Sequence, residues 1–241
     1  MSKKSKGLIF EQAIISGVSE DTGKVPQEHV DNARKLLQEA GVILEDLPSQ
    51  KQNFKFSEPG DPKTDIYFNN GEQEYKISVK YMSGIQLCSV NKNTVTKYFN
   101  IASNKSNVKS DRISNLVKSF ESLPKKVLEE EYQSWAKNKR AALNKEMNSV
   151  LESNPKLKES LADVAITGKG LFKDTRAVAN YILTETKLVK IDSDYIKKCA
   201  KQMKTDFRRK SRSNKKTGNR EVEANFRIDL NMKTMDSKEE L

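Results

Sequence analysis

The sequence has little of what several common functional sites require. Its 241 residues contain two cysteines, Cys88 and Cys199, and a single histidine, His29. Two cysteines so far apart form neither a disulfide framework nor a zinc-binding cluster, which indicates a reducing compartment. One histidine argues against a histidine-rich zinc site and against a Ser-His-Asp triad.

Long apolar runs are also missing. No stretch approaches the roughly 20 apolar residues that a membrane-spanning helix needs. In the N-terminal segment, Glu11 and Gln12 interrupt the apolar residues that a signal peptide would require. We therefore expect a cytoplasmic protein with no membrane partner.

Positive charge, in contrast, is abundant. Lysine and arginine total 44 against 33 acidic residues, for a net charge of +11, and 35% of the residues are hydrophobic. An excess of this size favours a polyanionic partner, nucleic acid above all, over a surface that is basic only for solubility. The length allows one large domain or two small ones with a real core.

The N-terminal third predicts two helices and a β-hairpin. Helical spacing predicts one helix over Gly7–Gly17 and a second from near Pro26 to before Gly41. Val42–Leu44 has the composition of a short strand. Thr64–Phe68 and Tyr75–Tyr81 are β-rich runs on either side of Asn70-Gly71, a strong hairpin turn.

The rest of the chain is mostly helical by pattern and ends in a second hairpin. Helices are expected over 110–120, from Pro124 through Val150, after Asn154-Pro155 to about 165, and near 175–186 and 193–203. Strands are expected over 205–212 and 220–230. This suggests a core at 1–107, a helical region at 108–204, a basic hairpin at 205–230 and a frayed tail at 231–241.

The first hairpin carries the residues best suited to chemistry. Its second strand alternates, so that Lys80 lies on the charged face and Tyr81 on the apolar one. Asp65 lies on the neighbouring strand, and cross-strand neighbours are within about 5–8 Å. Phosphodiester hydrolysis uses a hard cation held by carboxylates and a cationic group that orients the attacking water. Asp65 can supply the carboxylate, and Lys80 can supply the cationic group.

This arrangement resembles the PD-(D/E)xK nucleases, the superfamily of restriction endonucleases and Holliday-junction resolvases. In that superfamily an aspartate on one strand is followed by (Asp/Glu)-x-Lys on the next; Asp65 and Lys80 match the first and last positions. Glu11 is similar to a glutamate on the preceding helix. The runs Lys76–Tyr81 and Gly84–Leu87, with Thr167-Gly168-Lys169, Phe172 and Phe226–Asp229, are similar to phage-borne members.

Ser78 departs from the family pattern, because it stands where the family has an acid, and serine is a poor magnesium ligand. Glu11 is the first candidate to replace the missing carboxylate, and Glu74 the second. An alternative register uses Glu74-Tyr75-Lys76 as a complete Glu-x-Lys. A tight turn at Asn70-Gly71 would pair Asp65 near Lys76 and favour this alternative, whereas the resemblance favours Lys80. The alternative without a functional site is an ordinary amphipathic hairpin with a solvated charged face.

A second basic feature lies near the C-terminus. The segment 201–220 holds nine lysines and arginines against Asp206 alone. Such a run can neutralise phosphates, and a two-stranded ribbon can enter a DNA groove. The alternative is a charged loop without a fixed partner. The candidate DNA-binding residues are Gln86, Arg208, Arg209, Lys210, Arg212, Lys215 and Lys216.

We therefore expect an α/β protein with a restriction-endonuclease-like central mixed sheet flanked by helices. The resemblance implies a DNA endonuclease that uses Mg²⁺, with Mn²⁺ as a substitute, held by Asp65 and Glu11. A phage-encoded enzyme would act in the host cytoplasm, and cutting both strands makes a homodimer plausible. The alternatives are an inactive nucleic-acid-binding protein of the same fold and a basic structural or assembly protein.

Overall fold

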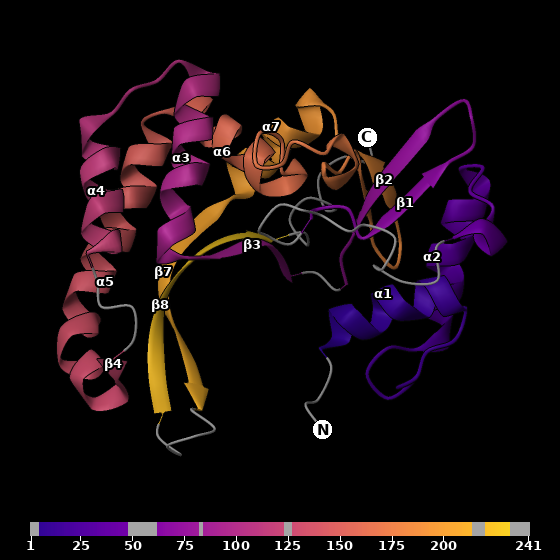
Figure 1. Cartoon of the computed structure of the whole chain (residues 1–241), viewed down its shortest axis with the longest axis horizontal. Helices are drawn as coiled ribbons and strands as arrows, with labels where there is room; N and C mark the ends of the chain where they lie inside the picture. The colour runs from indigo at the N-terminus through magenta and orange to yellow at the C-terminus, as the bar shows by residue number, and fades with distance from the viewer. Residues whose placement is uncertain (1–4, 48–61, 82–83, 123–126, 214–219, 232–241) are drawn as a thin grey trace, which may run out of the picture. The chain divides into compact units, whose positions relative to one another are not determined.

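The chain folds into two compact units (Figure 1). The computed structural model describes residues 5–47, 62–81, 84–122, 127–213 and 220–231. Unit 1 comprises residues 1–85 and 166–196, and unit 2 comprises 86–165 and 197–241. This division differs from the one expected at residues 107 and 204, since the chain leaves unit 1 after its first hairpin and returns 80 residues later.

Unit 1 begins with the two predicted helices, α1 (Lys6–Ser16) and α2 (Gln27–Glu39). The Ser5 hydroxyl accepts a hydrogen bond from the Leu8 amide and caps the start of α1. Gly17 ends the helix in the left-handed region, at φ 82°. The Arg34 guanidinium, from α2, donates to the Ile14 carbonyl at 2.5 Å and neutralises the negative end of α1.

The sheet of unit 1 is mixed, with strand order β1-β2-β5-β6. Its strands are β1 (Ile66–Asn69), β2 (Glu74–Val79), β5 (Tyr181–Leu183) and β6 (Leu188–Lys190). β1 and β2 are antiparallel, β2 and β5 are parallel, and β5 and β6 are antiparallel. Fold class and mixed sheet therefore agree with the prediction.

One face of this sheet packs against α1 and α2. The buried side chains that form this core alternate along the strands and repeat at helical spacing on the helices. They include Phe10, Ile14, Val30, Ala33, Leu37, Ile66, Phe68, Tyr75, Ile77, Val79 and Leu183. The opposite face of β2, which carries Lys76 and Ser78, is therefore available for polar residues.

Two local predictions in unit 1 are wrong. The segment Val42–Leu44 is not a strand; a 3₁₀ helix, η1 (Leu44–Asp46), follows it. The helix expected near 175–186 is replaced by a short 3₁₀ helix, η3 (Thr175–Ala177), and by β5. Tyr181-Ile182-Leu183 forms a strand because β2 supplies its parallel partner, a long-range contact that local spacing does not reveal.

Unit 2 combines helices with a second sheet of order β3-β8-β4, in which β7 also pairs with β8. Its elements are β3 (Gly84–Asn91), α3 (Lys92–Ser106), α4 (Asp111–Glu121), β4 (Val127–Leu128), α5 (Glu129–Glu152), α6 (Pro155–Thr167), α7 (Ser193–Gln202), β7 (Lys204–Ser213) and β8 (Arg220–Asn231). Both α6 and α7 have a few residues in unit 1. The predicted C-terminal hairpin is β7–β8. In the part of the chain that is described, no helix is long and apolar enough to cross a membrane.

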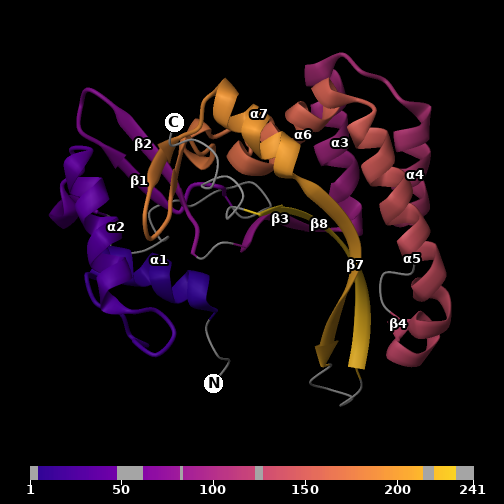
Figure 2. The same ribbon diagram turned by 180° about the vertical axis from the view of Figure 1, so that it is seen from behind.

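Helices α3, α4 and α5 pack beside the β7–β8 ribbon (Figure 2). Aromatic rings join them: Phe120 of α4 lies 4.6 Å from Phe207, and Phe99 of α3 lies 5.6 Å from Phe226, between ring centroids. The outer edge of β7 is closed by α5. Its Asn144 and Asn148 side chains exchange hydrogen bonds with the backbones of Phe207 and Thr205, as a neighbouring strand would.

Candidate active site at the start of the first hairpin

Asp65 lies at the start of the first hairpin. Its amide donates to the Ile77 carbonyl at 2.8 Å, and Ile77 is the partner of Ile66. Asp65 therefore lies just before the first paired residue of β1, and the register continues to Ser78 as the residue opposite it.

The Asp65 carboxylate occupies the place of a missing backbone partner. Its Oδ2 accepts hydrogen bonds from the Val79 amide at 2.8 Å and from the Ser78 hydroxyl at 3.4 Å. Ser78 is 1% exposed. The residue that departs from the family pattern is thus in direct contact with Asp65.

Lys80 directly follows Val79, the last residue of β2. Its amide donates to the Leu183 carbonyl at 2.8 Å, which continues the pairing of β2 with β5. Alternation places the half-buried Lys80 on the same face as Ser78, about 6.6 Å further along the chain. Asp65 and Ser78 are therefore in contact, and Lys80 follows two residues later on the same face by alternation.

The alternative register expected from a tight turn is wrong. Tyr67, not Asp65, pairs with Lys76, because the loop between β1 and β2 has four residues instead of two. Asparagine side chains stabilise this longer loop: Asn69 Oδ1 accepts from the Gly71 amide at 2.8 Å, and Asn70 Oδ1 from the Gln73 amide at 2.8 Å. The extra residues move Asp65 from Lys76 to Ser78.

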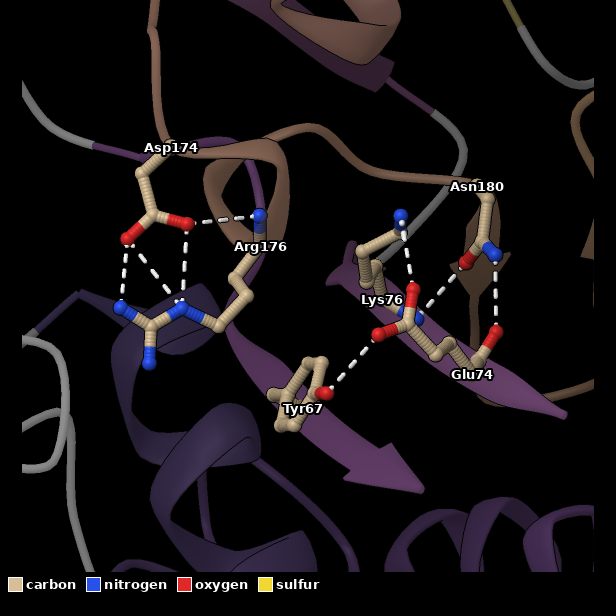
Figure 3. Close-up of polar contacts among 6 residues, drawn as sticks. All are labelled: Tyr67, Glu74, Lys76, Asp174, Arg176 and Asn180. Atoms are coloured by element: carbon tan, nitrogen blue, oxygen red, sulfur yellow. Dashed lines mark hydrogen bonds and ion pairs between the residues drawn. The ribbon is translucent and has the colours of Figure 1, made fainter. Parts of the chain in front are cut away.

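The structure does not bring Glu74 to Asp65. Four residues of extended chain separate Glu74 from Ser78, or about 13 Å. Glu74 instead accepts a hydrogen bond from the Tyr67 hydroxyl at 3.0 Å and lies 3.3 Å from the Lys76 ammonium (Figure 3). Both contacts, the Tyr67 bond foremost, lower the pKa of the Glu74 carboxyl.

Glu11 lies on α1 and is half-buried. The residue before it, Phe10, packs against Tyr81 with ring centroids 4.8 Å apart, and Tyr81 directly follows Lys80. Helix α1 therefore packs on the face of the sheet opposite the one that carries Ser78 and Lys80. Its position does not by itself bring Glu11 to Asp65, so Glu11 stays a prediction from the resemblance.

A magnesium site needs fewer protein ligands than a metal held by protein groups alone. Among the described residues, no three His, Cys, Asp or Glu side chains gather as a metal site. Mg²⁺ is commonly held by one or two carboxylates together with substrate phosphate and water. Asp65, with Glu11 as the second candidate, fits that pattern.

One polar pair at this end of the sheet was missed from the sequence. The Nδ1 atom of His29, on α2, lies 3.0 Å from the Tyr81 hydroxyl oxygen. Burial, and next the Glu185 carboxylate, raise the pKa of Tyr81. From the sequence, His29 stands out only as the single histidine. No pattern of spacing connects it with Tyr81, which lies 52 positions away.

The basic β7–β8 hairpin is more balanced than its sequence suggests. The register pairs Lys210 with Glu223 and Arg212 with Glu221, acids that lie beyond the segment counted from the sequence. Arg208, in contrast, pairs with Asn225 and donates to its Oδ1 at 3.4 Å.

Several predicted DNA-binding side chains fall outside the described part of the structure. Arg209, Lys210 and Arg212 lie on β7, and Gln86 on β3, but only their backbones are described. Lys215 and Lys216 lie outside the described residues altogether.

Comparison with known proteins returned no relative. No protein-family model matches the chain, and no curated protein or solved structure matches it either.

Proposed function

We propose that this chain is a Mg²⁺-dependent DNA endonuclease of the PD-(D/E)xK type. The observation that carries the proposal is the contact of the Asp65 carboxylate with Ser78 and Val79, next to Lys80. This is the strand position that the Asp…(Asp/Glu)-x-Lys pattern requires.

Each group at the site has its own role in the proposed hydrolysis of the phosphodiester. Asp65, with Glu11 as the candidate second ligand, would hold Mg²⁺. The bound metal supplies charge neutralisation and a more acidic water. Lys80 orients the attacking water and balances the charge that develops on the phosphate oxygens. The Val79 amide, bonded to Asp65, keeps the carboxylate oriented before substrate binds.

The architecture of unit 1 is compatible with this function. A hairpin, a crossover and a strand parallel to the hairpin's second strand form a mixed sheet, with helices on one face. The excess of 44 basic over 33 acidic residues suits a DNA substrate.

Plasmid cleavage tests the proposal. We expect the wild-type protein to cut DNA with Mg²⁺ and not with EDTA. Asp65→Asn should lower the rate by at least about 100-fold, since it removes the charge but keeps an oxygen for the Val79 amide. Glu74→Gln, at the distant end of the same face, is the matched control and should retain the rate. Wild-type protein that never cuts with Mg²⁺ contradicts the proposal.

A second candidate is a nucleic-acid-binding protein of the same fold that does not cleave. The buried Ser78 favours it, because this position lacks the acid that active members carry. Retention of plasmid on a gel, weakened steeply by salt and without cleavage, supports this alternative.

A further inference from the structure

The loop of residues 168–176, called the basic loop below, is anchored close to Asp65 in the chain. At one end Gly168 packs on Lys63, two residues before Asp65; a Cβ on Gly168 would lie 2.7 Å from the Lys63 Cγ. At the other end, Arg176 directly precedes Ala177, whose carbonyl accepts a hydrogen bond from the Lys63 amide. Both ends of the loop therefore lie beside Lys63.

The backbone of the basic loop is held in place. The Lys63 amide donates to the Ala177 carbonyl at 3.0 Å, and the Ala179 amide donates to the Thr167 carbonyl at 2.9 Å. Inside the loop, the Leu171 amide donates to the Gly168 carbonyl at 2.9 Å. A surface that is ordered before binding loses less entropy when a ligand arrives.

The side chains of the basic loop carry net positive charge. Lys169, Lys173 and Arg176 are exposed, and Asp174 is the only acid in the loop. The Asp174 carboxylate accepts two hydrogen bonds from the Arg176 guanidinium, at 3.0 Å from Nε and 2.6 Å from Nη2, as Figure 3 shows. These two bonds fix the orientation of the guanidinium.

We propose that the basic loop binds the DNA backbone on either side of the phosphodiester that faces Asp65, with Lys169, Lys173 and Arg176 contacting phosphates. This assignment rests on the proposed function and adds a substrate-binding surface to it. It places phosphate contacts in unit 1, separate from those expected on β7–β8. Phosphate is the fitting ligand because the loop combines several cations with a fixed backbone.

Salt dependence of DNA binding tests the proposal. The affinity of the full-length protein for a labelled DNA duplex is measured in EDTA at several salt concentrations. Each lost phosphate contact makes the slope of log affinity against log salt shallower by about 0.9. We expect the double variant K169A/K173A to shift the slope by about 2. Both side chains are exposed, so the fold should survive, which thermal melting verifies.

The matched control is K24A/K35A, which removes the same charge from the helical side of unit 1. Lys24 precedes α2 and pairs with Asp21, and Lys35 lies on α2, 3.7 Å from Glu39. An unchanged slope for K169A/K173A, or an equal change in both double variants, overturns the proposal. Should Asp65→Asn leave cleavage intact while K169A/K173A shifts the slope, the proposed catalytic site fails but the DNA-binding loop stands.

Discussion

The Asp65 carboxylate accepts a hydrogen bond from the Val79 amide, beyond the point where the pairing of β1 with β2 begins. A buried amide without a partner is costly, so Asp65 also stabilises the hairpin. This double role explains why Asp65→Asn is a better test than Asp65→Ala. Alanine would remove both the charge and the hydrogen bond.

Ser78→Asp restores the family's acid and gives the first prediction. The new carboxylate would lie in a buried position beside Asp65, and the repulsion should destabilise the fold by about 2 kcal/mol in EDTA. Mg²⁺ should reverse this loss, because a ligand that binds the folded state stabilises it. Thermal melting with Mg²⁺ and with EDTA measures both effects. A melting temperature of Ser78→Asp that does not respond to Mg²⁺ more than wild type counts against a metal at this position.

Gly168 gives the second prediction, which separates steric crowding from backbone strain. Gly168 has φ +76° and no room for a Cβ, whereas Gly71 has φ +89° and nothing within 4 Å. Gly71→Ala should cost about 1 kcal/mol from strain alone. Gly168→Ala should cost about 3 kcal/mol, because Lys63 and Phe172 must also move. Urea unfolding of both variants gives the difference; equal losses would show that the loop does not pack tightly on Lys63.

At the scale of elements, the sequence predicted well the features that depend on residues close together in the chain. Caps and spacing located α1 and α2 within one residue of their observed ends, and the hairpin turn at Asn70-Gly71 was found. The same hairpin shows the limit of such reasoning. Asn69 and Asn70 side chains stabilise a four-residue loop, and only that loop length decides that Asp65 meets Ser78.

Strand β5 was missed because its stability comes from elsewhere in the chain. Three residues, Tyr181-Ile182-Leu183, become the parallel neighbour of β2 only after the chain returns from unit 2. For the same reason the sequence singled out Thr167-Gly168-Lys169 by resemblance but did not connect it with Asp65. The packing of Gly168 on Lys63 is likewise a contact between distant segments.

The edge of β7 gives the third prediction. The Thr205 amide donates to Asn148 at 3.1 Å, and the Phe207 amide donates to Asn144 at 2.6 Å. Asn148→Ala should therefore speed hydrogen exchange of Thr205, and Asn144→Ala that of Phe207, each about tenfold for a bond of about 1.4 kcal/mol. Each variant is the control for the other. Exchange that rises equally at both amides in both variants would point to general loosening instead.

At the scale of the whole molecule, residues far apart in the sequence meet in unit 1. The hairpin with Asp65 and the basic loop both belong to this unit, although Lys169, the first lysine of the loop, follows Asp65 by 104 positions (169 − 65). The β7–β8 hairpin belongs to unit 2, where acids on β8 pair in register with several of its basic residues. The count of basic residues over 201–220 therefore overstates the excess of positive charge on that ribbon.

The last prediction concerns how many copies of the chain act on one DNA. The Asp65–Lys80 arrangement is one candidate site, and one site cuts one strand. At low protein concentration, supercoiled plasmid should therefore first become nicked circles. At high concentration, linear plasmid should appear with little nicked intermediate, because two copies related by a twofold axis would cut both strands. Gel analysis of the products over a range of concentrations, with sedimentation of the protein alone, measures this. Linear product formed directly where sedimentation shows only monomer would mean that one chain cuts both strands, and the single-site account of the molecule would have to be replaced.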